Sequence, residues 1–166
     1  MDITLFTNRY RVRRLDRADV PDVYSLCGKN RLYYEYCPPA VTKQSIIRDM
    51  DALPAGKDVR DKYYVGYYDG EKLIAVLDII TAYPEDKTAF IGFFMTDVSV
   101  QNSGVGSGII SDLLLYLKGS GFSDVQLGWI EGNPQAEHFW HKNGFAQMET
   151  VHDASGHTVV KARREL

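Results

Sequence analysis

A glycine-rich stretch between two apolar runs is the part of this sequence best suited to chemistry. It reads Gln101-Asn102-Ser103-Gly104-Val105-Gly106-Ser107 and follows the strand-like residues 89–97. Glycines let a backbone approach a ligand closely, and the first N–H groups of a helix are unpaired and carry a partial positive charge. Such a turn can bind a phosphate group, although a turn that only caps a helix has the same composition.

Two well-known phosphate-binding motifs do not fit this stretch. A P-loop needs a lysine directly after its glycines, and none is present. The dinucleotide-binding fingerprint needs a third glycine where Ile109 stands, and it belongs to parallel sheets, which the hairpin signal Asp69-Gly70 contradicts. The pattern that remains is Gln/Arg-x-x-Gly-x-Gly, matched by Gln101, Gly104 and Gly106.

Periodicity and turn signals predict the elements that position this stretch. Strands are expected at 10–14, 62–68, 72–82, 89–97, 125–130, 145–151 and 157–162, and helices at 19–27, 43–53, 105–117 and 133–142. Residues 31–39 are expected to form a loop because they end in Pro38-Pro39, and 154–156 a turn. The helix between strands 89–97 and 125–130 predicts a parallel crossover. The order predicts an α+β fold, a mixed and mostly antiparallel sheet with flanking helices, in one domain spanning 1–166.

Composition excludes several classes of protein. The chain has 166 residues, 45% of them hydrophobic, and a net charge of -3, which gives no electrostatic reason to expect nucleic acid binding. No apolar run is long enough to span a membrane, and the first residues do not resemble a signal peptide. The two cysteines do not make a disulfide framework. We therefore expect a cytoplasmic protein with free thiols, as a monomer or a homodimer. No metal site is expected, since His138 and His141 lack further ligands at a matched spacing.

A second motif stands downstream of the glycine stretch. Residues 133–145 read Asn-Pro-Gln-Ala-Glu-His-Phe-Trp-His-Lys-Asn-Gly-Phe. Together the two segments resemble the GNAT superfamily of N-acetyltransferases, whose pattern continues with an Asn and then Ala-x-x-Phe-Tyr-x-Lys-x-Gly-Phe. The matching residues are Asn133, Ala136, Phe139, Lys142, Gly144 and Phe145. The resemblance is good over about 63–151, and weaker before it.

The resemblance implies the acyl-CoA N-acyltransferase fold, with acetyl-CoA as cosubstrate. In this family the central strand splays from its parallel neighbour, and the pantetheine arm lies in the resulting cleft. The implied cofactor-binding residues are Phe94, Met95, Thr96, Gln101, Asn102, Ser103, Gly104, Val105, Gly106, Ser107, Asn133 and Trp140. A fixed N–H aimed at the thioester carbonyl can contribute roughly 3–4 kcal/mol to acyl transfer. Lys142 either reaches the CoA phosphates or balances the end of its helix.

The chain departs from the family pattern at the groups that move protons. Trp140 stands where relatives often have a tyrosine acid, and Gly92 and Gly128 stand where some have a glutamate base. An alkyl amine with a pKa of about 10.4 is unprotonated in only ~1 molecule per 2,500 at pH 7, so the missing base matters more than the missing acid. We expect Glu131 to deprotonate the amine, directly or through water. Asp97 is either a second candidate for this role or a support for the loop.

The acceptor is expected to be a primary amine on a small molecule or a protein. Tyr33, Tyr34, Tyr36 and Trp129 are the candidate residues for binding it, and each could instead be a packing aromatic. The predicted activity is direct transfer of an acetyl group from acetyl-CoA to that amine. Two alternatives stay open: a CoA-binding module without turnover that serves regulation or assembly, and a transferase for a longer acyl donor, with Gly92 and Gly128 leaving room.

Overall fold

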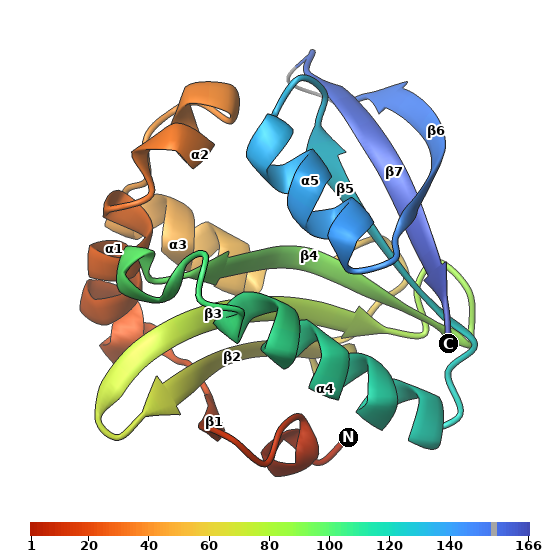
Figure 1. Cartoon of the computed structure of the whole chain (residues 1–166), viewed down its shortest axis with the longest axis horizontal. Helices are drawn as coiled ribbons and strands as arrows, with labels where there is room; N and C mark the ends of the chain where they lie inside the picture. The colour runs from red at the N-terminus through yellow and green to blue at the C-terminus, as the bar shows by residue number, and fades with distance from the viewer. Residues whose placement is uncertain (154–155) are drawn as a thin grey trace.

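The protein is described by a computed structural model that covers residues 1–153 and 156–166 (Figure 1). Its α-helices are α1 (Val20–Gly28), α2 (Arg31–Tyr36), α3 (Lys43–Asp51), α4 (Val105–Gly119) and α5 (Pro134–Lys142). Its strands are β1 (Arg11–Arg14), β2 (Lys62–Asp69), β3 (Lys72–Thr81), β4 (Thr88–Thr96), β5 (Asp124–Ile130), β6 (Ala146–His152) and β7 (Thr158–Glu165). Short 3-10 helices occupy Ile3–Leu5, Arg17–Asp19, Val59–Asp61 and Val98–Val100.

Within the described residues the strands form one seven-stranded sheet in the order β1-β2-β3-β4-β5-β7-β6. Every neighbouring pair is antiparallel except β4 and β5, which are parallel, as the crossover through α4 requires. Only four residue pairs join β4 to β5, and the last is Ile91 with Leu127. Beyond that pair the two strands separate, so the sheet opens between residues 92–96 and 128–130 (Figure 1).

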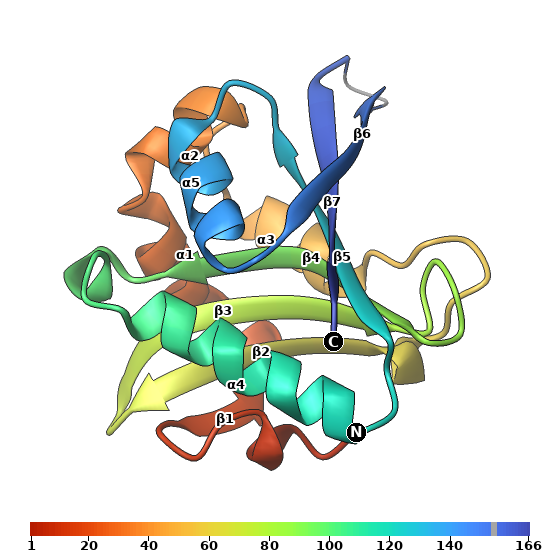
Figure 2. The ribbon, with the colours of Figure 1, turned by 45° about the vertical axis from the view of Figure 1, so that its right-hand side comes forward.

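The two faces of the sheet are covered by different helices. Helix α4 lies across one face, while α1 and α3 lie behind the other, as Figures 1 and 2 show. Helix α4 presents Ile109, Ile110, Leu113 and Leu117 to the larger core, in agreement with the spacing of its apolar residues. A second core on the opposite face joins α1 and α3 to residues such as Met95 of β4.

Local sequence signals explain where two of these helices begin. Thr42 and Ser45 form a capping box at the start of α3, in which each side chain accepts a hydrogen bond from the other's backbone N–H. Asn133 caps α5 through its Oδ1, which accepts a hydrogen bond from Ala136 N at 3.1 Å, and Pro134 stands at the first helical position.

The expected loop at 31–39 is wrong, because residues Arg31–Tyr36 form helix α2. Pro38-Pro39 ends this helix rather than preventing it. Tertiary packing holds the short helix: the ring of Tyr33 lies 6.0 Å from that of Phe93 in an edge-to-face arrangement, and Tyr34 packs against the second core. Tyr24, expected on the apolar face of α1, is exposed, and Leu26 is buried there instead. The turn expected at 154–156 lies partly outside the described residues.

Candidate functional site

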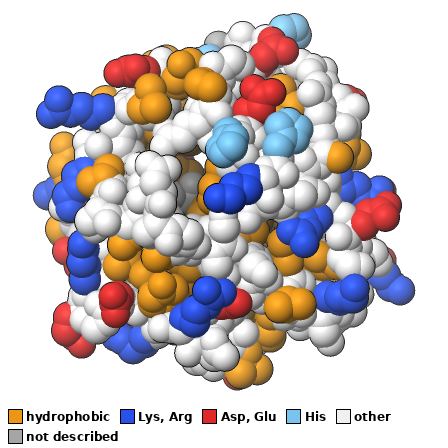
Figure 3. Space-filling view, viewed as in Figure 1, with side chains coloured by type: hydrophobic (Ala, Val, Ile, Leu, Met, Phe, Trp, Pro, Cys, Tyr) orange, Lys and Arg blue, Asp and Glu red, His pale blue; other side chains and the backbone are white. Residues whose placement is uncertain are grey.

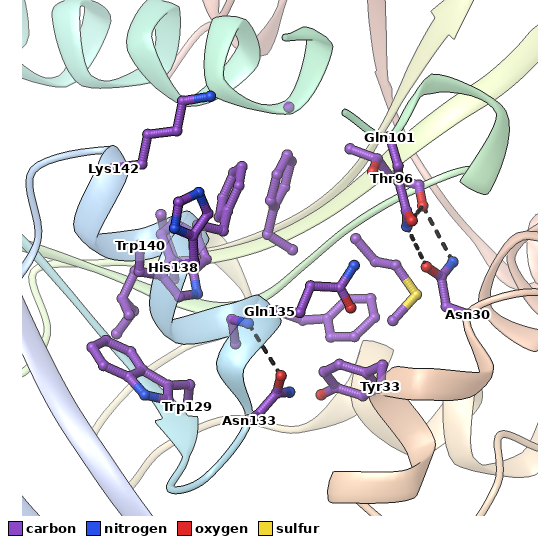
Figure 4. Close-up of a pocket in the computed structure, with 18 of the residues that line it drawn as sticks. Asn30, Tyr33, Thr96, Gln101, Trp129, Asn133, Gln135, His138, Trp140 and Lys142 are labelled. Carbon is purple, nitrogen blue, oxygen red and sulfur yellow. Dashed lines mark hydrogen bonds between the residues drawn. The ribbon is translucent and has the colours of Figure 1, made fainter. Parts of the chain in front are cut away.

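A cavity of about 470 Å³ lies where β4 and β5 separate. Its walls come from α2, the ends of β4 and β5, the glycine-rich stretch and α5 (Figure 4). In the space-filling view the face between α2 and α5 is hollowed, with His side chains and a Lys or Arg side chain beside the hollow (Figure 3). The cavity therefore sits where the parallel pairing of the sheet ends and main-chain groups lack a strand partner.

The glycine-rich stretch forms one end of this cavity. Gly104 caps α4 in the left-handed conformation, with φ at +88°, which an L side chain rarely adopts. The first hydrogen bond of the helix runs from Gly108 N to Gly104 O at 2.9 Å, so the N–H groups of residues 105–107 precede the helical ladder. Gly104, Gly106 and Ser107 line the cavity. These donors and the helix dipole suit an anionic group such as a pyrophosphate.

Gly106 is also needed for packing. A Cβ at this position would lie 3.3 Å from the ring of Phe139 and 3.4 Å from Thr96 Cγ2. The close approach lets the start of α4 lie against α5 and the end of β4. A side chain at residue 106 would push α4 away from these neighbours and from the cavity.

The side chain of Gln101 ties the stretch to α2. Gln101 Nε2 donates to Asn30 Oδ1 at 2.6 Å, and Asn30 Nδ2 donates to the carbonyl oxygens of Leu26 and Thr96 at 3.0 and 3.2 Å (Figure 4). Asn30 is buried, so these bonds are shielded from water. The glutamine of the motif thus fixes the position of the loop through its side chain.

Asp97, at the end of β4, holds the segment that leads into the same loop. Its Oδ1 accepts hydrogen bonds from Ser99 N at 3.0 Å and Ser99 Oγ at 2.5 Å, and its Oδ2 accepts one from Lys29 Nζ at 3.0 Å. Burial opposes ionisation of Asp97, but the bonds from Ser99 and Lys29 outweigh it and hold the pKa of this carboxyl below its usual range. Of the two roles considered for Asp97, the structure shows the supporting one.

The edge of β4 that faces β5 is unpaired beyond Ile91. Phe94, Met95 and Thr96 all line the cavity, and the strand partner of β4 there is β3, on its other side; the carbonyl oxygen of Thr96 also accepts from the side chain of Asn30. Unpaired N–H and C=O groups along a strand can bind an extended ligand as an added strand would. This edge is where the resemblance places the pantetheine arm.

Helix α5 forms the opposite wall. Asn133 is buried, and because its Oδ1 caps the helix, its Nδ2 group is left to donate. The rings of Phe94 and Phe139 stack at 5.8 Å, and Trp140 lies 6.2 Å from Phe94. Lys142 also lines the cavity, and its side chain extends toward α4 (Figure 4).

The structure separates the four aromatic residues expected at the acceptor. Tyr33 and Trp129 line the cavity. Tyr34 lies outside it, where its hydroxyl interacts with Cys27 and burial raises the pKa of both groups, that of Cys27 to about 11. Tyr36 is also outside the cavity lining. Among the expected cofactor residues, Ser103 and Val105 do not line the cavity, and the other ten do.

Glu131, expected to be the base, lies on the turn after β5. Its side chain is exposed, its backbone N–H donates to Thr158 O at 2.9 Å, and it is not among the residues that line the cavity. Its role in proton transfer stays a prediction. Gly92 and Gly128, which leave both usual base positions empty, do line the cavity. A Cβ at Gly128 would lie 2.8 Å from Val159 Cγ1, so Val159 fills the space there.

Several lining residues were not singled out in the sequence. They include Asn30, Cys37, Phe93 and Gln135, together with His138, which the sequence analysis considered only as a metal ligand. Asn30, Cys37 and Phe93 reach the cavity through the packing of α2 on β4, which no motif announces. Gln135 and His138 stand inside the second motif, so their place on α5 could have indicated them.

No cluster of three or more His, Cys, Asp and Glu residues suited to a metal ion occurs in the described part of the chain. In the same residues, no helix is long and apolar enough to cross a membrane.

The model of the acetyltransferase (GNAT) family matches residues 29–145 of this chain. This range includes α2, both motifs and most of the cavity wall. The chain belongs to the GNAT acetyltransferase family. Members of this family transfer acetyl groups from acetyl-CoA, and the expected GNAT fold, a mixed sheet with flanking helices, is confirmed.

Solved GNAT structures share this architecture at low sequence identity. An acetyltransferase from Thermus thermophilus aligns with a TM-score of 0.76 and 20% identity, over 95% of this chain and 97% of that one. The PaiA N-acetyltransferase from Thermoplasma acidophilum, solved in complex with coenzyme A, aligns with a TM-score of 0.68 and 15% identity, over 93% of this chain and 99% of that one.

The ribosomal-protein-S18-alanine N-acetyltransferase from Escherichia coli aligns with a TM-score of 0.68 and 12% identity, over 94% of this chain and 93% of that one. No curated protein matches the sequence significantly. Because the sequence identities are 20% or lower, the acceptor of this chain is not inferred from those of the solved structures.

Proposed function

We propose that this protein transfers an acetyl group from acetyl-CoA directly to a primary amine of a small molecule or a protein. The observation that carries the proposal is that the unpaired edge of β4 and the first N–H groups of α4 line one cavity. A donor with an extended amide-containing arm and a pyrophosphate needs both features together.

In this proposal each part of acetyl-CoA has its own residues. The N–H groups of residues 104–107 bind the pyrophosphate, with Gln101, Asn102 and Ser103 shaping the loop. The arm lies along Phe94, Met95 and Thr96, between β4 and the α5 residues Asn133 and Trp140. An N–H at the end of β4 polarises the thioester carbonyl, so that negative charge developing on its oxygen is stabilised.

The acceptor enters from the side of α2. Tyr33 and Trp129 bound the cavity there, and Tyr34 and Tyr36 belong to the same helix as Tyr33. Because thiols have a pKa near 8.5, CoA leaves as a thiolate without an acid, which suits the presence of Trp140 at the usual tyrosine position.

A CoA-binding module without turnover is the second candidate, favoured by the absence of the usual acid and base side chains at Trp140, Gly92 and Gly128. An assay of thiol release with a panel of primary amines, run beside a titration with CoA, separates the two. We expect saturable CoA binding and amine-dependent thiol release. Binding without release on any amine would support the module, and preference for a longer acyl-CoA would change the donor.

The Glu131→Gln variant tests the base expected from the sequence. If Glu131 takes the proton, this variant loses rate most strongly at low pH, where the acceptor is protonated. A pH–rate profile equal to that of the wild type would exclude Glu131 as the base.

A further inference from the structure

Gly92 is the extra residue of a β-bulge that faces the cavity. Ile91 pairs with Ile79 and Phe93 pairs with Asp78, so Gly92 has no partner of its own on β3. Gly92 is exposed, and it lines the cavity between Ile91 and Phe93. The ring of Phe93 contacts Tyr33 of α2, so this bulge belongs to the side of the sheet from which the acceptor enters.

The carboxyl group of Asp78 lies directly beside the bulge. A Cβ built on Gly92 would be 3.1 Å from Asp78 Oδ2 and 3.6 Å from its Cγ. Any side chain at residue 92 would therefore cover the carboxylate on that side. Asp78 itself is not among the residues that line the cavity; it lies behind Gly92, which has no side chain to separate the two.

The surroundings of Asp78 hold a charged carboxylate in a nearly closed environment. Its side chain is only 10% exposed, and Lys62 Nζ donates to Oδ2 at 2.6 Å. Oδ1 is buried and has no hydrogen-bond partner among the residues that the structure describes. The oxygen nearest to residue 92 is Oδ2, the one that accepts from Lys62, so a proton donor at the gap would share this oxygen with the lysine.

Two further groups act on Asp78 or its partner Lys62. Asp49 of α3 interacts electrostatically with both Lys62 and Asp78, and the ring of Tyr64 on β2 faces Lys62 Nζ at 5.9 Å. Burial raises the pKa of Asp78, Lys62 lowers it, and Asp49 raises it further. A carboxyl group with a raised pKa is a stronger base than an ordinary aspartate.

We propose that Asp78, reached through the gap at Gly92, is the general base that accepts a proton from the ammonium group of the acceptor. This inference rests on the proposed acetyltransferase function. The ammonium donates one proton to the Asp78 carboxylate, and the free amine nitrogen forms a bond to the thioester carbon. When the C–S bond breaks, CoA leaves as a thiolate, takes up the second proton released by that nitrogen, and Asp78 returns its proton to solvent.

The dependence of kcat/KM on pH tests this role, with 2-phenylethylamine, spermidine and a short peptide with a free α-amino group as acceptors. With a working base, log kcat/KM is level from the pKa of the base up to that of the acceptor. Without it, only the free amine reacts, and the rate rises tenfold per pH unit toward the acceptor pKa. For the wild-type protein we expect the level profile.

The Asp78→Asn variant keeps the size of the side chain and removes the base. We expect a loss of about 100-fold or more near pH 7 that shrinks as the pH approaches the acceptor pKa. Gly92→Ala keeps both charges of the Lys62–Asp78 pair and covers the carboxylate with a methyl group. In this variant log kcat/KM should therefore rise with pH, as it does in Asp78→Asn. Asp78→Glu restores a carboxylate and should keep the level profile, even at a reduced rate.

One matched control removes a carboxylate elsewhere: Asp49→Asn changes the other acidic group near Lys62 and should keep the level profile. Glu131→Gln tests the rival base expected from the sequence. A sloped profile in Glu131→Gln together with an unchanged profile in Asp78→Asn would assign the proton transfer to Glu131 and overturn the proposal. Circular dichroism melting of each variant reports folding; if Asp78→Asn does not fold, Gly92→Ala and Asp78→Glu decide the question.

Three results would overturn the proposal. A loss in Asp78→Asn by the same factor at every pH would show a structural role, and an unchanged profile would show no role. A sloped wild-type profile would mean that no enzyme group removes the proton. In each case thiol release by the wild type still supports the acetyltransferase, whereas no release on any of the three acceptors would contradict the proposed function and, with it, the base.

Discussion

At the scale of single residues, the site depends on polar side chains that position backbone. Three of these side chains hold the glycine-rich loop through hydrogen bonds within the protein: Gln101, Asn30 and Asp97. The motif glutamine is therefore best understood as a structural side chain. The groups that would bind the donor are mostly main-chain N–H and C=O groups, which depend on conformation more than on residue type.

Asp97 gives the residue-scale prediction for stability. Because its pKa is lower in the folded protein than the ordinary value of 3.8, its ionised form stabilises the fold. The contribution is complete above about pH 4 and is lost as pH falls through the lower folded-state pKa. We expect Asp97→Asn to reduce the free energy of unfolding by about 2 kcal/mol at pH 7. Urea unfolding at several pH values checks this.

The difference in unfolding free energy between wild type and Asp97→Asn should narrow below about pH 4. There the carboxyl of the unfolded chain takes up a proton, and the folded carboxyl does so only at its lower pKa. A gap of equal size at pH 7 and at strongly acidic pH would contradict the electrostatic account of this residue.

At the scale of elements, the sequence predicted what is local and missed what is tertiary. The apolar spacing of 105–117 and the turn at Asp69-Gly70 predicted α4 and the β2–β3 hairpin, because both signals depend on near neighbours. Helix α2 was missed because the packing of Tyr33 on Phe93 holds it, and that contact joins residues sixty positions apart in the chain. The bulge at Gly92 and its neighbour Asp78 were missed for the same reason.

The two ends of α4 offer a matched test of the anion-binding turn. Gly104, before the helix, and Gly121, just after it, have nearly equal φ angles of +88° and +89°, and a Cβ at either would meet nothing within 4 Å. An alanine at either position should cost about 1 kcal/mol of stability, because both adopt the left-handed conformation. Only Gly104→Ala should weaken CoA binding, by about tenfold, since only Gly104 orients the first N–H groups of the helix. Calorimetric titration of both variants measures this.

Equal CoA affinities for the two variants would contradict the role assigned to the start of α4. If the two variants lose equal stability but only Gly104→Ala binds CoA more weakly, the result would support this role, because the same backbone strain then affects CoA binding only at the start of the helix.

At the scale of the whole molecule, the opening between β4 and β5 connects the two faces of the sheet. Helices α5 and α2 border this opening from different sides, and the start of α4 lies at one end of it (Figures 1 and 4). In the proposed function the donor binds beside α4 and α5 and the acceptor enters beside α2, so that both occupy the opening together, as direct transfer requires. The cavity also contains Cys37, the one lining residue in the described chain with a thiol that could carry an acyl group instead.

Steady-state kinetics distinguish these routes. Direct transfer passes through a complex of both substrates, so double-reciprocal plots at several acceptor concentrations should intersect, and Cys37→Ser should keep most of the activity. Parallel lines together with an inactive Cys37→Ser variant would indicate an acyl-enzyme and contradict direct transfer.

The central claim is that main-chain N–H groups at the start of α4 bind the pyrophosphate of CoA. Isothermal titration with CoA and with pantetheine, which lacks the nucleotide and its phosphates, tests it most directly. We predict saturable CoA binding, clearly weaker binding of pantetheine, and a Gly104→Ala variant that lowers the affinity for CoA alone. No saturation at millimolar CoA, or equal affinities for the two ligands, would contradict the account.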